Sequence, residues 1–362
     1  MKNFTKVILV NFFILFILFL FAEFATRLSF SVKKCIDKDK GCSFLLMKSL
    51  KIKDDYISKN LNISTLDENL GYKLSNNFDQ IINAHGWDNI RLSTDKDGFR
   101  HNKIELKRDE NTILVVGDSY TLGEEVQNHE TWPSCLQMKI NSRVDNAGVF
   151  GYGTLQSLLR ANFFINKYEY STLIMSILVD NDFGRDAYSY RSGFAKPYLQ
   201  KNKDEIKVIK APDPYRPGTK FNPNKDIFYA FSTYSFIYSY LSSRSKFLPN
   251  GNYDRLTVKG NKAAEVNEII PWIIEKFSRL KVKKKIILLQ YGQNLESQDV
   301  IEERKKIIKV LNKYKSIYLI DTYQTLHKNE KTLNEKLWNP HHTHLGNKIV
   351  CEKIYNFFDN KL

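Results

Sequence analysis

From residue 112 onward, apolar positions follow two alternating patterns along the chain. Short continuous apolar runs over 112–116, 172–179, 286–289 and 317–320 are typical of strands buried on both faces of a sheet, and the segment 143–146 is predicted to be a shorter strand. Segments with helical spacing separate or follow them, over 132–140, 154–165, 263–281, 298–314 and 346–359. This alternation predicts a doubly wound, five-stranded parallel α/β sheet.

The amino-terminal segment has a different pattern. Residues 7–22 are apolar except for Asn11, and the apolar stretch continues to residue 25, which gives about the twenty residues that span a bilayer as a helix. The sequence therefore predicts one transmembrane helix over residues 7–25. A cleaved signal peptide is the alternative, but its apolar region is usually shorter, and Glu23 would lie where the cleavage site favours small residues.

The charges that flank this segment leave its orientation open. Lys2 and Lys6 precede it, and Arg27, Lys33 and Lys34 follow it, which is nearly a tie under the positive-inside rule. A short tail, one anchor and one long polar region are typical of a single-pass protein of the bacterial inner (cytoplasmic) membrane. We therefore expect the polar region on the periplasmic or extracellular side.

Changes in pattern divide the chain into three parts. Residues 1–27 are predicted to form a tail and anchor, residues 28–109 a stalk and a small β-rich cap, and residues 110–362 the α/β domain. An insertion at approximately 183–262 interrupts the alternation and contains several prolines followed by an aromatic run. Long insertions at strand ends often shape a substrate site, so we expect a lid or an acceptor-binding element, with plain surface packing as the alternative.

Composition narrows the class of protein. With 42% hydrophobic and 26% charged residues, the chain has enough apolar material for a large core, which excludes wholesale disorder. Its net charge of +15 would suit an anionic lipid or polysaccharide, or reflect a lysine-rich amino-acid usage. The lysines are scattered rather than arranged in a stripe with stacking aromatics, so no nucleic-acid partner is expected.

The four cysteines are too few for a disulfide scaffold. Cys35 and Cys42 flank a short polar stretch and could close a small loop in an oxidising compartment. Cys135 and Cys351 fall within predicted amphipathic helices, where a buried free thiol behaves as a small apolar side chain. We expect no chemistry from that second pair.

Gly-Asp-Ser-Tyr over 117–120 follows the first predicted strand directly. The Ser119 hydroxyl is therefore expected at the carboxyl edge of the sheet, where doubly wound folds bind their ligands. A serine hydroxyl is a weak nucleophile until a base takes its proton, and the oxyanion that then forms needs fixed donors. The motif predicts chemistry only if such partners lie elsewhere in the chain.

Candidate partners follow the other predicted strands. Residues 146–153, Asn-Ala-Gly-Val-Phe-Gly-Tyr-Gly, end the second strand, and residues 179–182, Val-Asp-Asn-Asp, end the third. A glycine lets a backbone N–H approach an oxyanion closely, and an Asn amide supplies two donors on a short stem. A simple turn is the alternative for each segment taken alone.

The segment 339–346, Asn-Pro-His-His-Thr-His-Leu-Gly, lies between the last strand and the last helix. An imidazole there could lean over the sheet edge towards Ser119 and act as its general base. The three histidines, His341, His342 and His344, could instead bind zinc, but no Cys or acidic residue in this loop completes a ligand set. We expect neither a metal nor a cofactor.

These four motifs resemble, in order and spacing, the conserved blocks of the SGNH (GDSL-like) hydrolase superfamily, whose sheet is flavodoxin-like. The resemblance covers residues 110–360 and implies Ser119 as nucleophile and oxyanion donor, Gly151 and Asn181 as further oxyanion donors, and His341 as base. The apolar amino terminus ending in residues 23–27, Asp-Gly-Phe-Arg over 97–100, and the segments 117–126, 130–133 and 146–153 are similar to membrane-anchored bacterial SGNH proteins, several of which act on acylated surface carbohydrates.

The sequence departs from that family at one position. The family places an Asp two or three residues before the catalytic His, where this chain has Trp338 and Asn339. Asn339 could accept a hydrogen bond from the ring but would not stabilise an imidazolium as a carboxylate does. Asp321 is a second candidate for the acid. His341 is preferred to His344 because it precedes Gly346 by the family's usual spacing.

The resemblance implies three functional hypotheses. The first is a serine esterase or deacylase that acts on an O-acylated carbohydrate or lipid outside the cytoplasm. Acetyl is the acyl group we expect. The second is an O-acyltransferase that uses the same Ser–His site to acylate a surface glycan. The third, motivated by the missing Asp, is a catalytically lapsed domain that binds glycan or serves as a scaffold. The substrate, acceptor and oligomeric state stay open at this point.

Overall fold

The structure is a computed structural model that describes residues 2–36, 62–84, 86–191, 194–203, 205–211 and 262–361. These residues belong to two separate units, the helix α1 (Lys2–Ile36) and an α/β unit formed by the other described residues. Cys42 lies outside the described residues, and with it the predicted pairing of Cys35 and Cys42.

Helix α1 contains the apolar amino-terminal stretch, and the large apolar side chains described between Val7 and Phe24 are exposed. Within the described part of the chain, we find no helix that combines the length and the apolar composition needed to cross a membrane. The transmembrane helix predicted over residues 7–25 is therefore not confirmed.

The α/β unit is built around a five-stranded parallel sheet with the order β14-β13-β7-β5-β6. Its strands are β5 (Ile113–Val116), β6 (Val144–Asn146), β7 (Thr172–Leu178), β13 (Lys284–Gln290) and β14 (Ile317–Asp321). All residues of β5 and β7 are buried, which explains their continuous apolar sequences. The predicted fold class and all five strands are confirmed.

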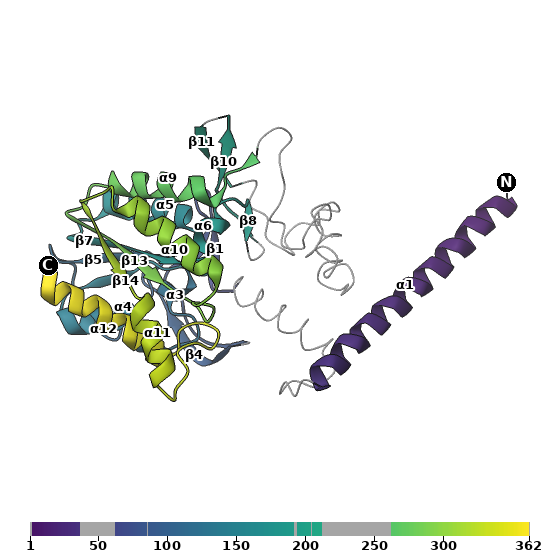
Figure 1. Cartoon of the computed structure of the whole chain (residues 1–362), viewed down its shortest axis with the longest axis horizontal. Coiled ribbons are helices and arrows are strands. Elements are labelled where there is room, and N and C mark those ends of the chain that lie inside the picture. The colour runs from purple at the N-terminus through teal and green to yellow at the C-terminus, as the bar shows by residue number, and fades with distance from the viewer. Residues whose placement is uncertain are drawn as a thin grey trace. The chain divides into compact units, whose positions relative to one another are not determined.

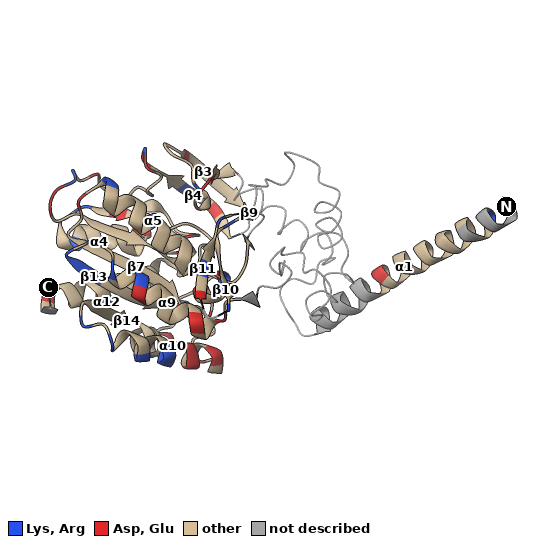
Figure 2. Ribbon diagram, turned by 90° about the horizontal axis from the view of Figure 1, so that it is seen from above, with Lys and Arg blue, Asp and Glu red and all other residues tan. Residues whose placement is uncertain are grey.

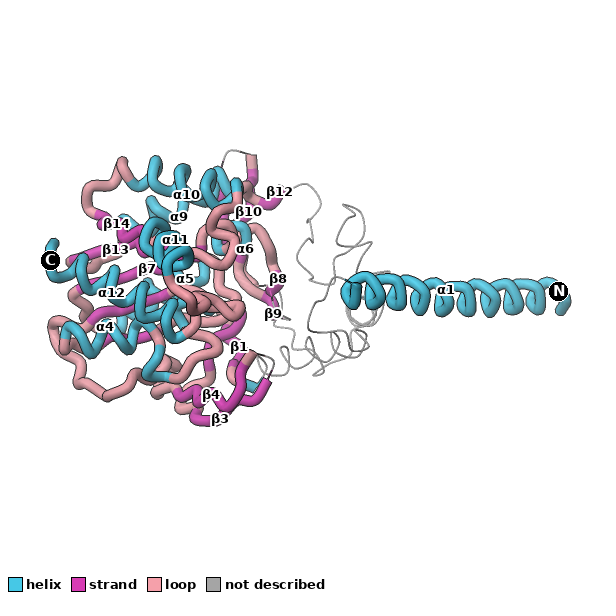
Figure 3. Tube along the Cα trace, turned by 60° about the horizontal axis from the view of Figure 1, so that its bottom comes forward, coloured by secondary structure: helices cyan, strands magenta, loops and turns pink. Residues whose placement is uncertain are grey.

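Helices cover both faces of this sheet (Figure 1). On one face lie α4 (Trp132–Ile140), α11 (Tyr323–Thr332) and α12 (His344–Lys361), and on the other α5 (Thr154–Lys167), α9 (Val266–Ser278) and α10 (Gln298–Leu311). Figure 3 follows the alternation of helices and strands along the chain. Because β6 and β7 lie on opposite sides of β5, the chain reverses its direction across the sheet at the carboxyl end of β5.

One pair of cysteines corrects the sequence interpretation. Cys135 in α4 and Cys351 in α12 form a disulfide with a Cα–Cα distance of 6.1 Å. We expected two buried free thiols, and that expectation was wrong because the two helices pack against each other on the same face of the sheet. Spacing in the sequence could not reveal this contact, because the two residues are 216 positions apart.

The described residues before the sheet form two antiparallel strand pairs. They are β1 (Ser64–Asp67) with β2 (Gly71–Leu74), and β3 (Asp79–Ala84) with β4 (Trp87–Ser93). Their buried side chains, Tyr72 and Trp87 among them, belong to an apolar cluster that also contains Leu122, Phe150 and Phe194. These strands therefore pack on the loops that follow β5 and β6.

Only the two ends of the predicted insertion are described. The first end contains α6 (Asp182–Arg185) and the strands β8 (Tyr190–Arg191), β9 (Phe194–Ala195), β10 (Tyr198–Asn202) and β11 (Glu205–Ile209). At the second end, β12 (Lys262–Ala263) pairs with β10, which also pairs with β11. Four prolines of the insertion, at positions 212, 214, 217 and 223, and its aromatic run lie outside the described residues, so its role as a lid stays a prediction.

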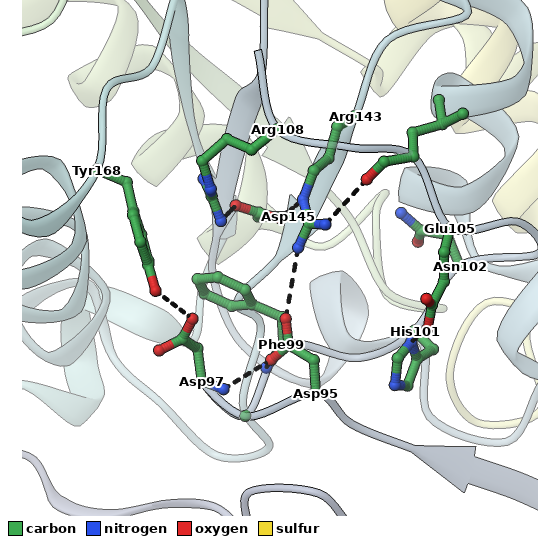
Figure 4. A network of polar contacts seen from close by, with 12 residues as sticks. Asp95, Asp97, Phe99, His101, Asn102, Glu105, Arg108, Arg143, Asp145 and Tyr168 are labelled. Carbon is green, nitrogen blue, oxygen red and sulfur yellow. Dashed lines mark hydrogen bonds and ion pairs between the residues drawn. The ribbon is translucent and has the colours of Figure 1, made fainter.

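A polar network fixes the turn that precedes the sheet (Figure 4). Arg143 lies between two carboxylates, with its Nε 2.6 Å from Asp145 Oδ1 and its Nη2 3.4 Å from Asp95 Oδ2. Arg108 binds Asp145 from its other side at 2.6 Å. This network holds the Asp-Gly-Phe-Arg turn in place, and the turn ends at the buried Arg100.

Charged residues are spread over many elements of the α/β unit. In Figure 2, short blue (Lys, Arg) and red (Asp, Glu) segments are scattered over the helices and loops. Several of them pair across or within helices, such as Lys139 with Glu352 at 2.9 Å and Lys305 with Glu302 at 3.0 Å. Within the described part of the chain, the positive charge is therefore distributed as the scattered lysines of the sequence suggested.

Candidate active site

Ser119 lies at the carboxyl end of β5, where a fully buried strand meets the short helix α3 (Ser119–Leu122). Asp118 caps this helix, since its Oδ1 accepts a hydrogen bond from the Tyr120 N–H at 2.9 Å. A Cβ at Gly117 would lie 2.2 Å from Thr121 Oγ1 and 2.9 Å from Ser176 O, so only glycine fits the turn. The serine is thus delivered to the sheet edge in a fixed orientation.

The predicted base meets the predicted nucleophile. His341 Nε2 lies 3.0 Å from Ser119 Oγ, although the two residues are 222 positions apart. This is hydrogen-bonding distance, so the hydroxyl can donate its proton directly to the ring. The structure therefore brings together the two residues that the sequence singled out as base and nucleophile.

The other two histidines of the loop have different surroundings. The ring of His342 is buried and its Nε2 lies 3.2 Å from the carbonyl oxygen of Tyr291, which also accepts a hydrogen bond from Trp338 Nε1 at 2.8 Å. Burial lowers the pKa of His342 to about 3, so the ring is neutral and holds the loop. His344 is mostly exposed and begins α12.

The far side of the His341 ring faces carboxylates that the sequence analysis missed. Nδ1 lies 3.3 Å from Glu125 Oε1 and 3.8 Å from Glu124 Oε2. The backbone N–H of His341 also donates to Glu125 Oε2 at 3.2 Å. The signal was present in the sequence, since two consecutive glutamates follow Ser119 closely, but glutamates at this spacing are common in exposed loops.

Neither acid candidate from the sequence takes this place. The side chain of Asn339 is exposed, and its backbone N–H donates to the carbonyl oxygen of His341 at 2.7 Å. Asp321 accepts a hydrogen bond from the Tyr291 hydroxyl at 2.9 Å and pairs with Arg304 at 2.6 Å. Asp321 therefore supports the end of β14 and the loop after β13.

The surroundings of His341 make it a stronger base. Burial by itself would lower the pKa of the ring, but contact with Glu125 and the negative charges of Glu124, Glu125 and Asp118 outweigh burial and raise the pKa above its ordinary value of 6.5. The same charges stabilise the imidazolium that forms when the ring takes a proton. This arrangement suits a general base that must hold a proton briefly.

Gly151 and Asn181 follow the two strands that flank β5 in the sheet. Gly151 has a φ of 67°, in the left-handed region that favours glycine. Asn181 directly precedes α6 at the end of β7. Both loops therefore leave the sheet at the edge that carries Ser119, and the donor role of each residue towards an oxyanion stays a prediction.

A buried arginine connects the three loops. Arg185 Nη1 lies 3.0 Å from Asp118 Oδ2, 2.7 Å from Asp182 Oδ1 and 2.7 Å from the carbonyl oxygen of Tyr152. These partners are the direct chain neighbours of Ser119, Asn181 and Gly151 respectively. Burial alone would lower the pKa of Arg185, but the two carboxylates raise it by more, so the side chain remains a cation.

No model of a protein family matches this chain, and no curated protein matches it. Among solved structures, it is similar to a member of the lipolytic protein G-D-S-L family from Veillonella parvula, with 15% identity, a TM-score of 0.40 and coverage of 69% of this chain and 98% of the other.

Two further similarities are of the same kind. A putative lipolytic protein of the G-D-S-L family from Desulfitobacterium hafniense has 13% identity and a TM-score of 0.38, with coverage of 68% of this chain and 98% of the other. A catalytic mutant of Axe2, an acetylxylan esterase from Geobacillus stearothermophilus, has 11% identity and a TM-score of 0.40, with coverage of 68% and 93%.

Proposed function

We propose that this protein is a serine ester hydrolase in which Ser119 is the nucleophile and His341 the general base. The observation that carries this proposal is the 3.0 Å distance between Ser119 Oγ and His341 Nε2 at the carboxyl edge of a parallel sheet. The lapsed-domain hypothesis depended on a missing carboxylate. It loses that support because Glu124 and Glu125 lie beside the ring of His341.

The geometry supports a two-step reaction. Ser119 Oγ attacks the ester carbonyl carbon while its proton passes to His341 Nε2, which gives a tetrahedral intermediate with a negative oxygen. The backbone N–H groups of Ser119 and Gly151 and the Asn181 amide are the donors proposed for that oxygen. The bond between the acyl carbon and the alkoxide then breaks, His341 protonates the leaving alkoxide, and the acyl group stays bound to Ser119 Oγ. Water attacks this acyl group by the same steps, which releases the acid and restores the Ser119 hydroxyl.

The proposed substrate is an O-acylated carbohydrate or lipid outside the cytoplasm, as the sequence resemblance implies. The disulfide between Cys135 and Cys351 supports an extracytoplasmic location, because disulfides persist in oxidising compartments. The apolar and exposed stretch of α1 is the segment for which a membrane contact is proposed.

Turnover of 4-nitrophenyl acetate by the full chain tests the reaction. We expect Ser119→Ala and His341→Ala each to lower kcat/KM by about 10³-fold or more. Ser171→Ala is the matched control, because Ser171 directly precedes β7 at the opposite end of the strands and its hydroxyl donates to the carbonyl oxygen of Asn111. Wild-type turnover by a folded Ser119→Ala protein would contradict the proposal.

A further inference from the structure

One arginine, Arg100, makes several hydrogen bonds to the loop that follows α3. Arg100 is 2% exposed, and its guanidinium donates to the carbonyl oxygens of Leu122 at 3.0 Å, of Gly123, and of Val126 at 2.6 Å. Its Nε donates to Asn128 Oδ1 at 2.9 Å. A rigid planar donor that binds this many acceptors fixes the backbone between residues 122 and 128, which is the segment that carries Glu124 and Glu125.

The backbone of Glu125 is strained. Its φ is 70°, in the left-handed region that a side chain other than glycine rarely adopts. Such strain persists only where the surrounding structure enforces it, and it gathers at functional sites. Here the strained backbone presents the Glu125 carboxylate to His341.

Gly86, which directly precedes β4, lies against the same carboxylate. A Cβ built at Gly86 would lie 2.6 Å from Glu125 Oε1 and 3.1 Å from Glu125 Cδ. Gly86 also has a φ of 79°. The backbone of the cap therefore approaches the carboxylate as closely as a residue without a side chain allows, and this contact limits where the carboxylate can move.

We propose that Glu125 is the positioning acid of the site and takes the role of the Asp that is missing from positions 338 and 339. Its carboxylate contacts His341 twice, with Oε2 at the backbone N–H and Oε1 at Nδ1. One carboxylate thus binds the backbone of the loop and lies beside the ring. When Nε2 takes the Ser119 proton, the Nδ1–H of the imidazolium faces Oε1, and the proton stays on the ring.

Glu125 is preferred to Glu124 on geometry. Glu124 Oε2 is farther from Nδ1, at 3.8 Å, and its side chain is fully buried close to the positive charge of Arg100. The 3.3 Å contact of Glu125 lacks the alignment of a full hydrogen bond. Catalytic hydrogen bonds are often long before the substrate binds and shorten in the complex.

A bound cation is the competing use of the same groups. Ligand atoms of Glu124, Glu125 and His341 lie within 4.8 Å of one another. Proton chemistry is favoured because the second ring nitrogen of His341 is already directed at Ser119 Oγ. Turnover that is lost in EDTA and restored by a divalent metal would overturn the assignment, whereas unchanged turnover in EDTA supports it.

The test compares Glu125→Gln, Glu125→Asp and the neighbouring control Glu124→Gln in the full chain, with 4-nitrophenyl acetate as substrate. We expect Glu125→Gln to lower kcat by about 10²- to 10⁴-fold with a much smaller change in KM, because the amide keeps the shape but not the charge. Glu125→Asp should recover part of kcat. Glu124→Gln should lower kcat less than Glu125→Gln does.

The pH profile gives a readout that a purely structural role would not change. In the wild type, kcat/KM should rise as His341 loses its proton, at a pH above 6.5. The groups that face this ring are Asp118, Glu124 and Glu125, together with the rings of Tyr120 and His342. Removing the charge of Glu125 lowers the pKa of the ring, so the acid limb of Glu125→Gln should move to lower pH.

The inference rests on the proposed function, and the two fail separately. If Ser119→Ala and His341→Ala abolish turnover but Glu125→Gln keeps the wild-type kcat and acid limb, the role of Glu125 is overturned and the dyad stands. A larger loss in Glu124→Gln than in Glu125→Gln would also overturn it. If Ser119→Ala keeps turnover, the proposed function itself fails.

Discussion

Arg185 shows how single side chains assemble this site from distant loops. The three groups that it binds belong to the loops after β5, β6 and β7, which carry Ser119, Gly151 and Asn181. Breaking a buried ion pair costs free energy of folding, because removing one partner leaves the other charge buried and uncompensated. Arg185 therefore sets the relative position of the nucleophile and the proposed oxyanion donors.

Arg185→Lys tests this positioning role. Lysine keeps the charge but is a compact cation that lacks the planar fork, so the three loops should lose their common anchor. We expect kcat for 4-nitrophenyl acetate to fall about ten- to a hundredfold with a smaller change in KM, because small displacements of reacting groups cost rate. Steady-state kinetics together with circular dichroism of the folded protein measure this.

The control for that variant is Arg143→Lys. Arg143 also pairs with a buried carboxylate, Asp145, but it lies before β6, at the opposite end of the strand from Gly151. We expect Arg143→Lys to lower the melting temperature and leave kcat unchanged. Equal losses of kcat in both variants would show that Arg185 acts only through stability.

At the scale of elements, buried strands and the residues at their ends were predictable. The runs that form β5, β7 and β13 are continuous and apolar because helices cover both faces of the sheet. Ser119 could be located from sequence because it closely follows β5, and His341 because it lies shortly before α12. Their distance from each other could be known only from the folded chain.

Other features of the site depend on contacts that sequence spacing does not encode. Glu125 reaches His341 because Arg100, from a turn before the sheet, fixes the backbone of its loop. The disulfide between α4 and α12 depends on which face of the sheet each helix covers. The sequence resemblance places the acid next to His341 in the chain, but the residue there is the exposed Asn339. The carboxylate beside the ring comes from the distant Glu125 instead.

The α4–α12 disulfide leads to a prediction about stability. Removing it should lower the free energy of unfolding by about 2–5 kcal/mol, because the unfolded chain regains the freedom of a long closed loop. Cys135→Ser, Cys351→Ser and the double variant should all be destabilised to a similar extent, since each removes the same bond. Urea unfolding of the four proteins measures this, and losses that simply add in the double variant would contradict it.

At the scale of the whole molecule, the α/β unit places its chemistry at one end of one sheet. The reversal of strand order at β5 leaves the loops after β5, β6 and β7 next to one another, and the loop before α12 brings His341 to the same edge. The strand β4 then packs on these loops, with Trp87 in the same apolar cluster as Leu122. These parts together bring a serine, an imidazole and a carboxylate close to one another.

Covalent labelling shows whether Ser119 is a nucleophile that His341 activates. The full chain is treated with a fluorophosphonate, and mass spectrometry of its peptides locates the adduct and measures its rate of formation. We expect a single adduct on Ser119 that is absent in Ser119→Ala and forms at least about a hundredfold more slowly in His341→Ala. An adduct on another residue, or an equal rate in His341→Ala, would contradict it.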